Sequence, residues 1–322
     1  MPLIESQYKS PWWLPGGHAQ TLFPRLFRRV PSVSYQRERI TTPDDDFLDL
    51  DWSRIGGNRL AILLHGLEGC SRSHYILGLV HALTNTGWDT LSLNFRGCGG
   101  EMNRQARFYH SGETTDIHTV VEHAAKQFGV DEIALVGISL GGNAAMKYLG
   151  EQGSHLNLRV RKAVAISIPC DLASSSRKLA AVSNRVYMKY FLSTLTKKAR
   201  AKAERFPGLF ETDRLESMTS FAEFDEQITA PLHGFDSAED YWTKSSSRPF
   251  IPKITIPTLM LAARNDPFLT PECFPEKEAR ESNLFHLESP QNGGHAGFFP
   301  PTGKRLYWSE SQTVKFLDET NL

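Results

Sequence analysis

The chain has 322 residues, enough for two domains or for one large α/β domain that carries an insertion. Hydrophobic residues make up 40% of the chain and charged residues 22%, a composition that allows a sizeable core and excludes wholesale disorder. The 36 Lys and Arg residues balance the 36 Asp and Glu residues, so no overall basic field favours a nucleic-acid partner.

Targeting and redox features of the sequence predict a cytoplasmic protein. No apolar run approaches the roughly 20 residues that a membrane-spanning helix needs. Residues 1–5 lack the basic and apolar regions of a signal peptide. The four cysteines lie far apart and form no C-x-x-C or zinc-like motif: Cys70, Cys98, Cys170 and Cys273. We interpret them as isolated thiols of a reducing compartment and predict no metal site.

Residues 1–32 are predicted to form an N-terminal arm packed on the rest of the protein. Residues 11–18 are rich in aromatic and turn-forming residues and have neither helical nor strand periodicity. We expect their two tryptophans to be buried against the body. Residues 32–35 and 47–52 then alternate between apolar and polar side chains, with turn formers at 42–46 between them, which predicts a β-hairpin.

Short apolar runs and helically spaced stretches alternate from residue 60 onward. The runs lie at residues 60–64, 90–95, 133–136, 162–166, 258–262 and 284–287, and the helical stretches at 75–86, 116–128 and 143–151. Apolar strands that alternate with helices indicate a mostly parallel sheet flanked by helices on both faces. We therefore assign residues 33–171 and 248–322 to one α/β core.

Residues 172–247 interrupt this alternation and are predicted to be a helical cap insertion. Apolar residues at helical spacing predict one long amphipathic helix from about Ser176: Leu179, Val182, Val186, Tyr190, Phe191 and Leu195. The other face of this helix is basic, and the stretch that follows it is acidic. Either the two halves pack together as a self-complementary insertion, or the basic face contacts an anionic surface such as phospholipid headgroups.

The motif Gly-Ile-Ser-Leu-Gly-Gly at residues 137–142 carries the strongest chemical signal. It follows an apolar run directly and opens a helical stretch, so Ser139 is expected on a tight strand-to-helix turn that needs Gly137 and Gly141 as small neighbours. Such a turn projects the hydroxyl above the carboxyl end of the sheet. We predict that Ser139 is a nucleophile. The alternative is a glycine-rich turn that only binds a phosphate.

A serine hydroxyl needs a base, and the base needs a carboxylate that orients it. In this type of sheet the chain order is Ser, then Asp or Glu, then His. Asp266 follows the run at 258–262, and His295 lies in a glycine-flanked loop near the C-terminus. These residues are the predicted acid and base. Asp171, which also follows a strand, is the alternative acid.

Other histidines fit the role of the base less well. His286 lies inside a predicted strand, and His118 and His123 lie on a predicted helix. The oxyanion of a tetrahedral intermediate needs backbone donors, and we predict the N–H groups of Leu140, directly after the nucleophile, and of Leu67, in a glycine-containing loop after a strand. His65, in the same loop, is expected to brace the turn by hydrogen bonding.

These residues resemble the α/β-hydrolase superfamily over nearly the whole chain, and more narrowly the YheT-like esterases of the AB hydrolase 4 family. The narrower resemblance rests on the motifs at residues 16–21, 65–69, 94–100, 109–114, 137–143 and 265–267. It implies the α/β-hydrolase fold and a charge-relay triad of Ser139, Asp266 and His295. Eukaryotic members of this family act on medium-chain acyl esters or phospholipids, some fungal ones pass acyl groups to alcohols, and bacterial members are mostly assigned esterase activity by homology. The His-acid acyltransferase motif of some relatives is not carried over, because His110 and Asp116 have five residues between them instead of four.

The sequence therefore predicts a serine carboxylic-ester hydrolase that acts without a cofactor, through an acyl-enzyme, on a lipophilic small-molecule ester with a short- to medium-chain acyl group. An acyltransferase differs only in whether an alcohol or water resolves the acyl-enzyme, so it stays an alternative. A non-catalytic binding protein on the same fold is the second alternative. The chain length of the acyl group and the oligomeric state are left open by the sequence.

Overall fold

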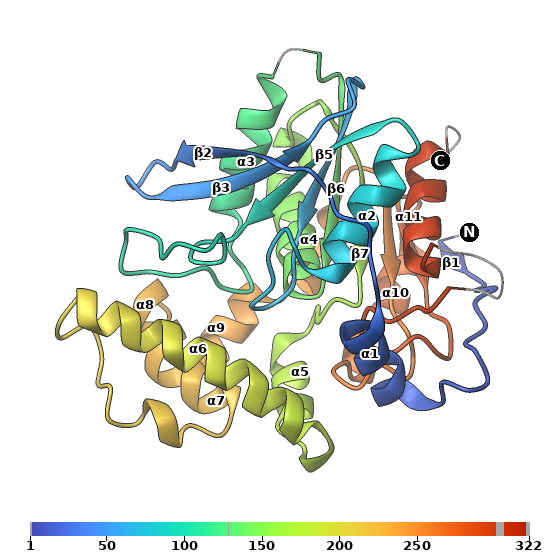
Figure 1. Ribbon diagram of the computed structural model, residues 1–322. Helices are drawn as coiled ribbons and strands as arrows, with labels where there is room; N and C mark the ends of the chain where they lie inside the picture. Colours follow the sequence, from blue (N-terminus) through green and yellow to red (C-terminus); the bar gives the residue numbers. More distant parts are fainter. Residues whose placement is uncertain (1, 128, 301–305, 320–322) are drawn as a thin grey trace.

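The computed structural model describes residues 2–127, 129–300 and 306–319 (Figure 1). Over these residues, nine strands form one sheet in the order β1-β9-β8-β7-β6-β4-β5-β3-β2. Their bounds are β1 Leu3–Ile4, β2 Gln36–Thr41, β3 Phe47–Ser53, β4 Arg59–Leu64, β5 Trp88–Asn94, β6 Glu132–Ile138, β7 Val160–Ile166, β8 Thr258–Leu261 and β9 Phe285–Glu288. All neighbouring pairs from β1 to β5 in this order are parallel, whereas β3 pairs antiparallel with β5 and with β2. The mostly parallel α/β fold is confirmed.

Helices cover both faces of this sheet (Figure 1). Their bounds are α1 Gly16–Phe27, α2 His74–Thr84, α3 Thr115–Ala125, α4 Leu140–Gln152, α5 Leu172–Leu179, α6 Arg185–Arg205, α7 Phe221–Phe224, α8 Ala230–His233, α9 Ala238–Ser245, α10 Glu276–Glu281 and α11 Trp308–Asp318. Phe128, the last residue of the helix predicted at 116–128, lies outside the described residues, as do the two ends of the chain that belong to the predicted segments 1–32 and 248–322.

Strand β4 illustrates why the sheet must be covered twice. Its side chains alternate between two cores: Leu60, Ile62 and Leu64 pack in the cluster that contains α3 and α4, and Ala61 and Leu63 in the cluster that contains α2 and α11. A strand with apolar residues at every position has no face for water, because successive side chains point to opposite sides of a sheet. Strand β4 therefore needs a layer of helices on each side of the sheet.

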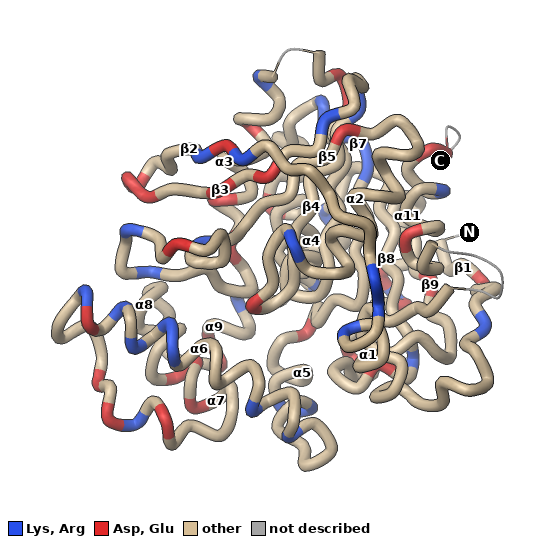
Figure 2. Tube along the Cα trace, in the orientation of Figure 1, with Lys and Arg blue, Asp and Glu red and all other residues tan. Residues whose placement is uncertain are grey.

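The predicted hairpin is present, but its first strand is β2, not residues 32–35. Strand β2 pairs with β3 through charged cross-strand neighbours, and these charges are visible in Figure 2. The guanidinium of Arg37 donates to Asp51 and that of Arg39 to Asp49, at 2.7–3.0 Å. A search for apolar alternation misses such a strand, because ion pairs and not apolar burial define its register.

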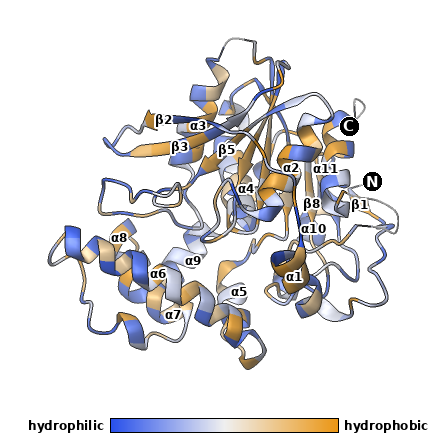
Figure 3. Cartoon of the chain, viewed as in Figure 1, coloured by the Kyte–Doolittle hydropathy of each residue, from blue (hydrophilic) through white to orange (hydrophobic). Residues whose placement is uncertain are grey.

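The N-terminal arm differs from the prediction in two respects. A helix, α1, begins at Gly16, inside the stretch predicted to be irregular. The expected burial of the tryptophans is wrong, since Trp12 is 92% exposed and Trp13 is 44% exposed. Figure 3 shows the apolar character of α1, which continues this exposed surface.

Smaller residues anchor the arm instead of the tryptophans. Tyr8 is buried and packs against the rings of Phe298 and Trp308, while β1 adds a parallel edge strand to β9. Leu14 is also buried, and its carbonyl accepts a hydrogen bond from the buried side chain of Gln20. The arm is thus anchored to the core through β1 and Tyr8, and the tryptophans are left exposed.

The predicted single helix from about Ser176 is wrong, because the chain forms α5 and α6 with a break between them. Ala181 has an extended backbone, and the buried side chain of Asn184 donates to the carbonyl oxygens of Lys178, at 2.9 Å, and Pro267, at 2.8 Å. The break therefore depends on a tertiary contact and not on Gly or Pro. As a result Val182 and Val186 are exposed instead of buried.

The charges of segment 172–247 are only partly self-complementary. Arg200 pairs with Glu216 at 2.9 Å and Arg177 approaches Glu239 at 3.9 Å, and these exposed pairs contribute little to stability. Lys202 instead points inward and donates to the carbonyl of Asn103.

The division of the chain into an arm, a core and a cap stays a prediction. No helix in the described part of the chain is long and apolar enough to cross a membrane.

Candidate active site

Ser139 lies on a sharp turn between β6 and α4. Its backbone has φ 53° and ψ −122°, a strained conformation for a residue with a Cβ atom. A Cβ atom on Gly137 would lie 2.4 Å from the Cα of Gly142, and one on Gly141 would lie 2.4 Å from the carbonyl oxygen of Leu64. Only glycine fits these positions, so the local sequence fixes the turn that raises the Ser139 hydroxyl above the sheet.

His295 and Asp266 lie next to this hydroxyl. The Nε2 atom of His295 is 2.9 Å from the Oγ of Ser139, and its Nδ1 atom is 2.9 Å from the Oδ2 of Asp266. The carboxylate of Asp266 is buried, and its other oxygen accepts a hydrogen bond from the backbone N–H of Phe268. A carboxylate can only accept, so the Nδ1 atom of His295 carries the proton and its Nε2 atom is free to accept one from Ser139.

The structure brings the predicted oxyanion residues to the same place. A Cβ atom on Gly66 would lie 3.2 Å from the Cβ of Ser139, so the loop that contains Leu67 runs beside the serine. Leu67 and Leu140 line one cavity together with Ser139 and His295. Leu140 is the first residue of α4, where backbone N–H groups have no partner within the helix.

His65 braces this loop, as predicted. Its Nδ1 atom donates to the carbonyl of Gly66 at 2.7 Å, and its Nε2 atom accepts from the backbone N–H of Phe95 at 3.2 Å. Burial lowers the pKa of His65 to about 4, so the ring is neutral and can donate and accept at once. Next in the loop, Glu68 has φ 54° and its carboxylate accepts from Lys198 of α6 at 2.8 Å.

The alternative candidates lie elsewhere. Asp171 caps α5, where its side chain accepts from the backbone N–H of Ser174. His123 pairs with Glu38 at 3.0 Å, and the ring of His286 packs against Phe316. His118 lies 3.5 Å from the hydroxyl of Tyr148, on the face of α3 that meets α4. None of these contacts reaches Ser139 or His295.

Helix α1 holds the loops of the acid and the base, a role that the sequence patterns do not predict. The side-chain oxygen of Gln20 accepts from the backbone N–H of Gly293 at 2.7 Å and from Asn265 at 3.0 Å. The hydroxyl of Thr21 accepts from the backbone N–H of His295 at 2.9 Å. The motif at residues 16–21 could have indicated that α1 has a role at the site. Periodicity alone does not show that its residues contact the loop of His295, about 270 residues away in the sequence.

The cavity at Ser139 has two lobes. The first, of about 90 Å³, contains Ser139 and His295 and has mostly apolar walls from α5, α6, α7 and the loop after β8: Leu172, Leu179, Phe191, Phe221 and Phe268. The second, of about 80 Å³, mixes apolar wall residues such as Phe108, Leu195 and Phe224 with several polar ones, and we call it the polar lobe; its polar residues include Glu68, Tyr109, His110, Lys198, Asp225 and His233. Both lobes are lined by Leu67, Ser111, Leu140, Phe221, Asp225 and Tyr241, so they meet beside the serine.

Two histidines of the polar lobe are uncharged. Burial lowers the pKa of His110 to about 4 and that of His233 to about 3, so both imidazoles are neutral near pH 7. Burial also raises the pKa of Asp225 to about 6. The Nε2 atom of His233 is buried and has no hydrogen-bond partner among the described residues. Within the same residues, no group of three or more His, Cys, Asp or Glu side chains is arranged to hold a metal ion.

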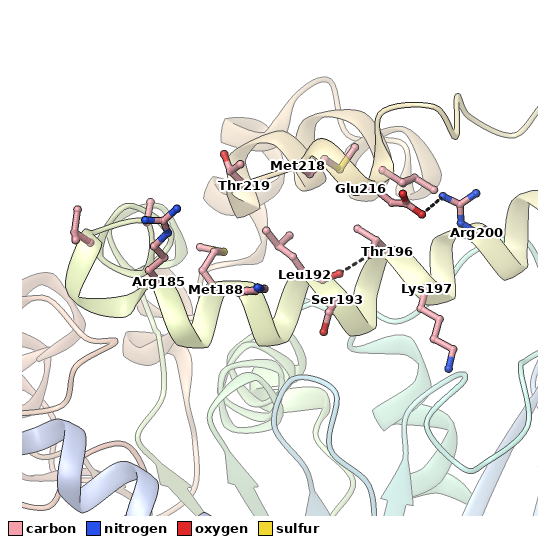
Figure 4. A pocket seen from close by; sticks show the side chains of 14 residues that line it. Arg185, Met188, Leu192, Ser193, Thr196, Lys197, Arg200, Glu216, Met218 and Thr219 are labelled. Carbon is pink, nitrogen blue, oxygen red and sulfur yellow. Dashed lines mark hydrogen bonds and ion pairs between the residues drawn. The ribbon is translucent and has the colours of Figure 1, made fainter.

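A larger hollow, of about 840 Å³, lies away from this chemistry. Figure 4 shows it between α6 and residues 215–219, lined by side chains such as Met188, Leu192 and Met218. It contains none of the predicted site residues. Size alone therefore does not identify the site.

Comparisons with known proteins identify the family of the chain. The sequence model of the alpha/beta hydrolase fold family matches residues 61–300. The chain is 38% identical over 310 residues to "Putative esterase YheT" of Escherichia coli (strain K12), covering 93% of this chain and 89% of that protein. It is 28% identical over 307 residues to "Phospholipase ABHD3" of Homo sapiens, covering 92% and 75%.

The solved structure of the Pyrococcus furiosus esterase Pf2001 has the same fold, with a TM-score of 0.59 and 18% identity over 90% of this chain and 97% of that one. The fold, the position of the Ser139 motif between a strand and a helix, and the identity to YheT over most of the chain all indicate the same family. The chain belongs to the α/β-hydrolase family, in the group of proteins related to YheT.

Proposed function

We propose that the protein is a serine carboxylic-ester hydrolase with Ser139, His295 and Asp266 as its catalytic triad. The observation that carries the proposal is the continuous series of hydrogen bonds from Ser139 through His295 to Asp266, both links at 2.9 Å. Names of relatives add support, since they include an esterase, a phospholipase and, at 28% identity over 277 residues, a monoacylglycerol lipase of Saccharomyces cerevisiae.

The reaction proceeds through an acyl-enzyme. His295 takes the hydroxyl proton of Ser139 as the oxygen attacks the ester carbonyl, and the backbone N–H groups of Leu67 and Leu140 bind the oxyanion. Collapse of this intermediate breaks the bond to the alcohol, which leaves with the proton from His295. Water then gives its proton to His295, attacks the acyl-enzyme and releases the acid, and Ser139 regains its proton. Asp266 holds the imidazole in its tautomer and stabilises its positive charge.

The two lobes assign the two halves of the substrate. The apolar lobe suits the acyl group, and its volume of about 90 Å³ favours short- to medium-chain acyl groups over long ones. The polar lobe, with neutral imidazoles and several donors and acceptors, suits a small hydroxylated alcohol. Residues 172–247 act as the cap in this proposal, because α5, α6 and α7 supply most of the apolar wall.

Hydrolysis of p-nitrophenyl butanoate tests the proposal. We expect a burst of p-nitrophenol that equals the enzyme concentration if deacylation is slow, and no release by the Ser139→Ala variant. A non-catalytic binding protein would release none in either form. Addition of an alcohol separates the remaining alternative: an acyltransferase converts the acyl-enzyme mainly to the new ester, whereas a hydrolase continues to yield mainly the acid.

The cytoplasmic location stays a prediction.

A further inference from the structure

Exposed apolar side chains concentrate on two segments that contact each other. The described residues include eleven large apolar side chains that are exposed, and eight of them lie in residues 12–27 and 182–190. We call these eight the α1–α6 patch: Trp12, Trp13, Leu22, Leu26, Phe27, Val182, Val186 and Tyr190. Scattered single residues of this kind are normal on a soluble protein, but a cluster marks an interaction surface.

Contacts between helices α1 and α6 make the patch continuous. The hydroxyl of Tyr190 accepts from Arg25 at 2.7 Å, and the ring of His18 stacks on Tyr187. Val186 and Tyr190 are four residues apart at the start of α6, so they share one face of this helix, and Val182 lies in the short turn just before it. On α1, Leu22 and Leu26 have the same spacing and flank Arg25. Figure 3 shows both helices on the outside of the molecule.

The two segments that carry the patch contain basic residues but no acidic ones. Residues 6–37 and 172–203 contain no Asp or Glu. Five exposed basic residues border the apolar side chains: Arg25, Arg29, Lys178, Arg185 and Lys189. No ion pair involves any of these five within the described parts of the chain. Figure 2 shows the basic positions along α1, α5 and α6.

We propose that the α1–α6 patch docks on the surface of an anionic phospholipid membrane. Trp, Phe and Leu side chains enter the boundary between headgroups and acyl chains, and the bordering Arg and Lys residues contact lipid phosphates. A second copy of the chain fits the surface poorly, because a symmetric contact would bring the same basic residues together. The docking surface is thus the start of α6 together with α1, and not the inner face of α6, where Lys202 is buried.

The surface borders the proposed active site. Between α1 and the chain that leads from α5 to α6 lies a cavity of about 400 Å³, whose lining includes Gly17, His18, Lys178, Ser183 and Asp266. A docked molecule would therefore hold the Asp266 side of the site close to lipid. Docking itself does not rest on the proposed chemistry, so the two can fail separately.

Cosedimentation with vesicles tests the docking. We expect binding to phosphatidylcholine vesicles that contain 30 mol% phosphatidylglycerol, and binding at least about tenfold weaker without the anionic lipid or in 0.5 M NaCl. The variants Leu26→Ser/Phe27→Ser and Val182→Ser/Val186→Ser should each bind about tenfold more weakly or worse, because each loses exposed apolar area that would enter the lipid. Arg185→Gln/Lys189→Gln should lose the preference for anionic lipid. All these side chains are exposed, so the fold is expected to persist.

Matched controls use equally exposed residues elsewhere. Ile55→Ser/Leu158→Ser and Lys277→Gln should bind as the wild type does, and so should Ser139→Ala, which removes the proposed chemistry alone. Trp12 provides a direct signal: vesicles should shift the tryptophan emission to shorter wavelength in the wild type and less so in Trp12→Phe.

Three results would overturn the proposal. The first is that the protein binds vesicles with and without phosphatidylglycerol equally well, or binds neither. The second is that the patch variants bind anionic vesicles as well as the wild type does. The third is a dimer in solution, seen by light scattering, that the patch variants convert to monomers, since this would assign the surface to a second copy of the chain.

Discussion

Replacement of Gln20 by Met tests whether the N-terminal helix positions the catalytic base. Met keeps the volume of the side chain but can neither accept from Gly293 and Asn265 nor donate to the carbonyl of Leu14. Two of these three hydrogen bonds are fully buried, so their partners cannot turn to water. At about 1–3 kcal/mol for each of these two unpaired buried groups, the free energy of unfolding should fall by about 2–6 kcal/mol.

The same change should reduce activity beyond its effect on folding. Gly293 and Asn265 belong to the two loops that carry His295 and Asp266, and a displacement of about 1 Å at a reacting group costs on the order of 10²-fold in rate. We expect kcat for p-nitrophenyl butanoate to fall about 10²-fold at a temperature where the variant is folded. Urea unfolding measures stability, and circular dichroism establishes that the assay contains folded protein.

Gln7→Met is the matched control, because Gln7 lies on the same arm and is exposed. It should change neither stability nor kcat. A Gln20→Met protein that is destabilised as expected but has kcat within threefold of the wild type would refute the positioning role and leave Gln20 as a packing residue only.

Four further predictions follow from the site and its surroundings. Asp266→Asn should lower kcat by about 10⁴-fold in a steady-state assay, because the amide favours the wrong tautomer of His295, whereas Asp171→Asn should change it little; the reverse order would identify Asp171 as the acid. Leu179→Trp should fill the apolar lobe and lower kcat/KM for octanoyl esters at least about tenfold more than for acetyl esters, and a wild-type preference for acetyl over octanoyl would contradict a lipophilic acyl site. Lys198→Met leaves the carboxylate of Glu68 buried without its cation, so the free energy of unfolding should fall by about 3–5 kcal/mol. The Glu68→Gln/Lys198→Met double variant removes the buried charge as well and should restore part of this loss. Burial lowers the pKa of His74 to about 4, so between pH 6.5 and pH 4 the unfolded chain binds a proton that the folded chain does not, and the urea midpoint should decrease as pH falls. His74→Leu should flatten this decrease and His155→Leu, at an exposed position, should not; equal slopes in all three proteins would exclude His74 as a source.

The sequence predicts the sheet and the serine turn well because both depend on local patterns. A buried parallel strand has apolar residues throughout, as β4 and β6 do. The glycines on both sides of Ser139 form a short pattern that is visible in the sequence. The steric need for Gly137 acts within a few residues, whereas that for Gly141 comes from the carbonyl of Leu64 at the end of β4. Parallel strands also end at the same edge, so chain order suffices to nominate Asp266 and His295.

Long-range contacts account for the features that were missed. The break between α5 and α6 depends on Asn184 reaching the carbonyl of Pro267, 83 residues away. Gln20 contacts Gly293 across 273 residues, and no periodicity encodes such a pair. Trp12 and Trp13 were expected inside because large aromatic residues are usually buried, but the arm is anchored by Tyr8 and Leu14 instead.

The rate at which a fluorophosphonate probe labels the protein tests most directly whether His295 activates Ser139. Peptide mapping by mass spectrometry should find one label per molecule, on Ser139, and none on the Ser139→Ala variant. Labelling of the His295→Gln variant should be slower by about 10³-fold or more, because the hydroxyl then has no base within reach. A label on another residue, or an undiminished labelling rate in His295→Gln, would contradict the mechanism.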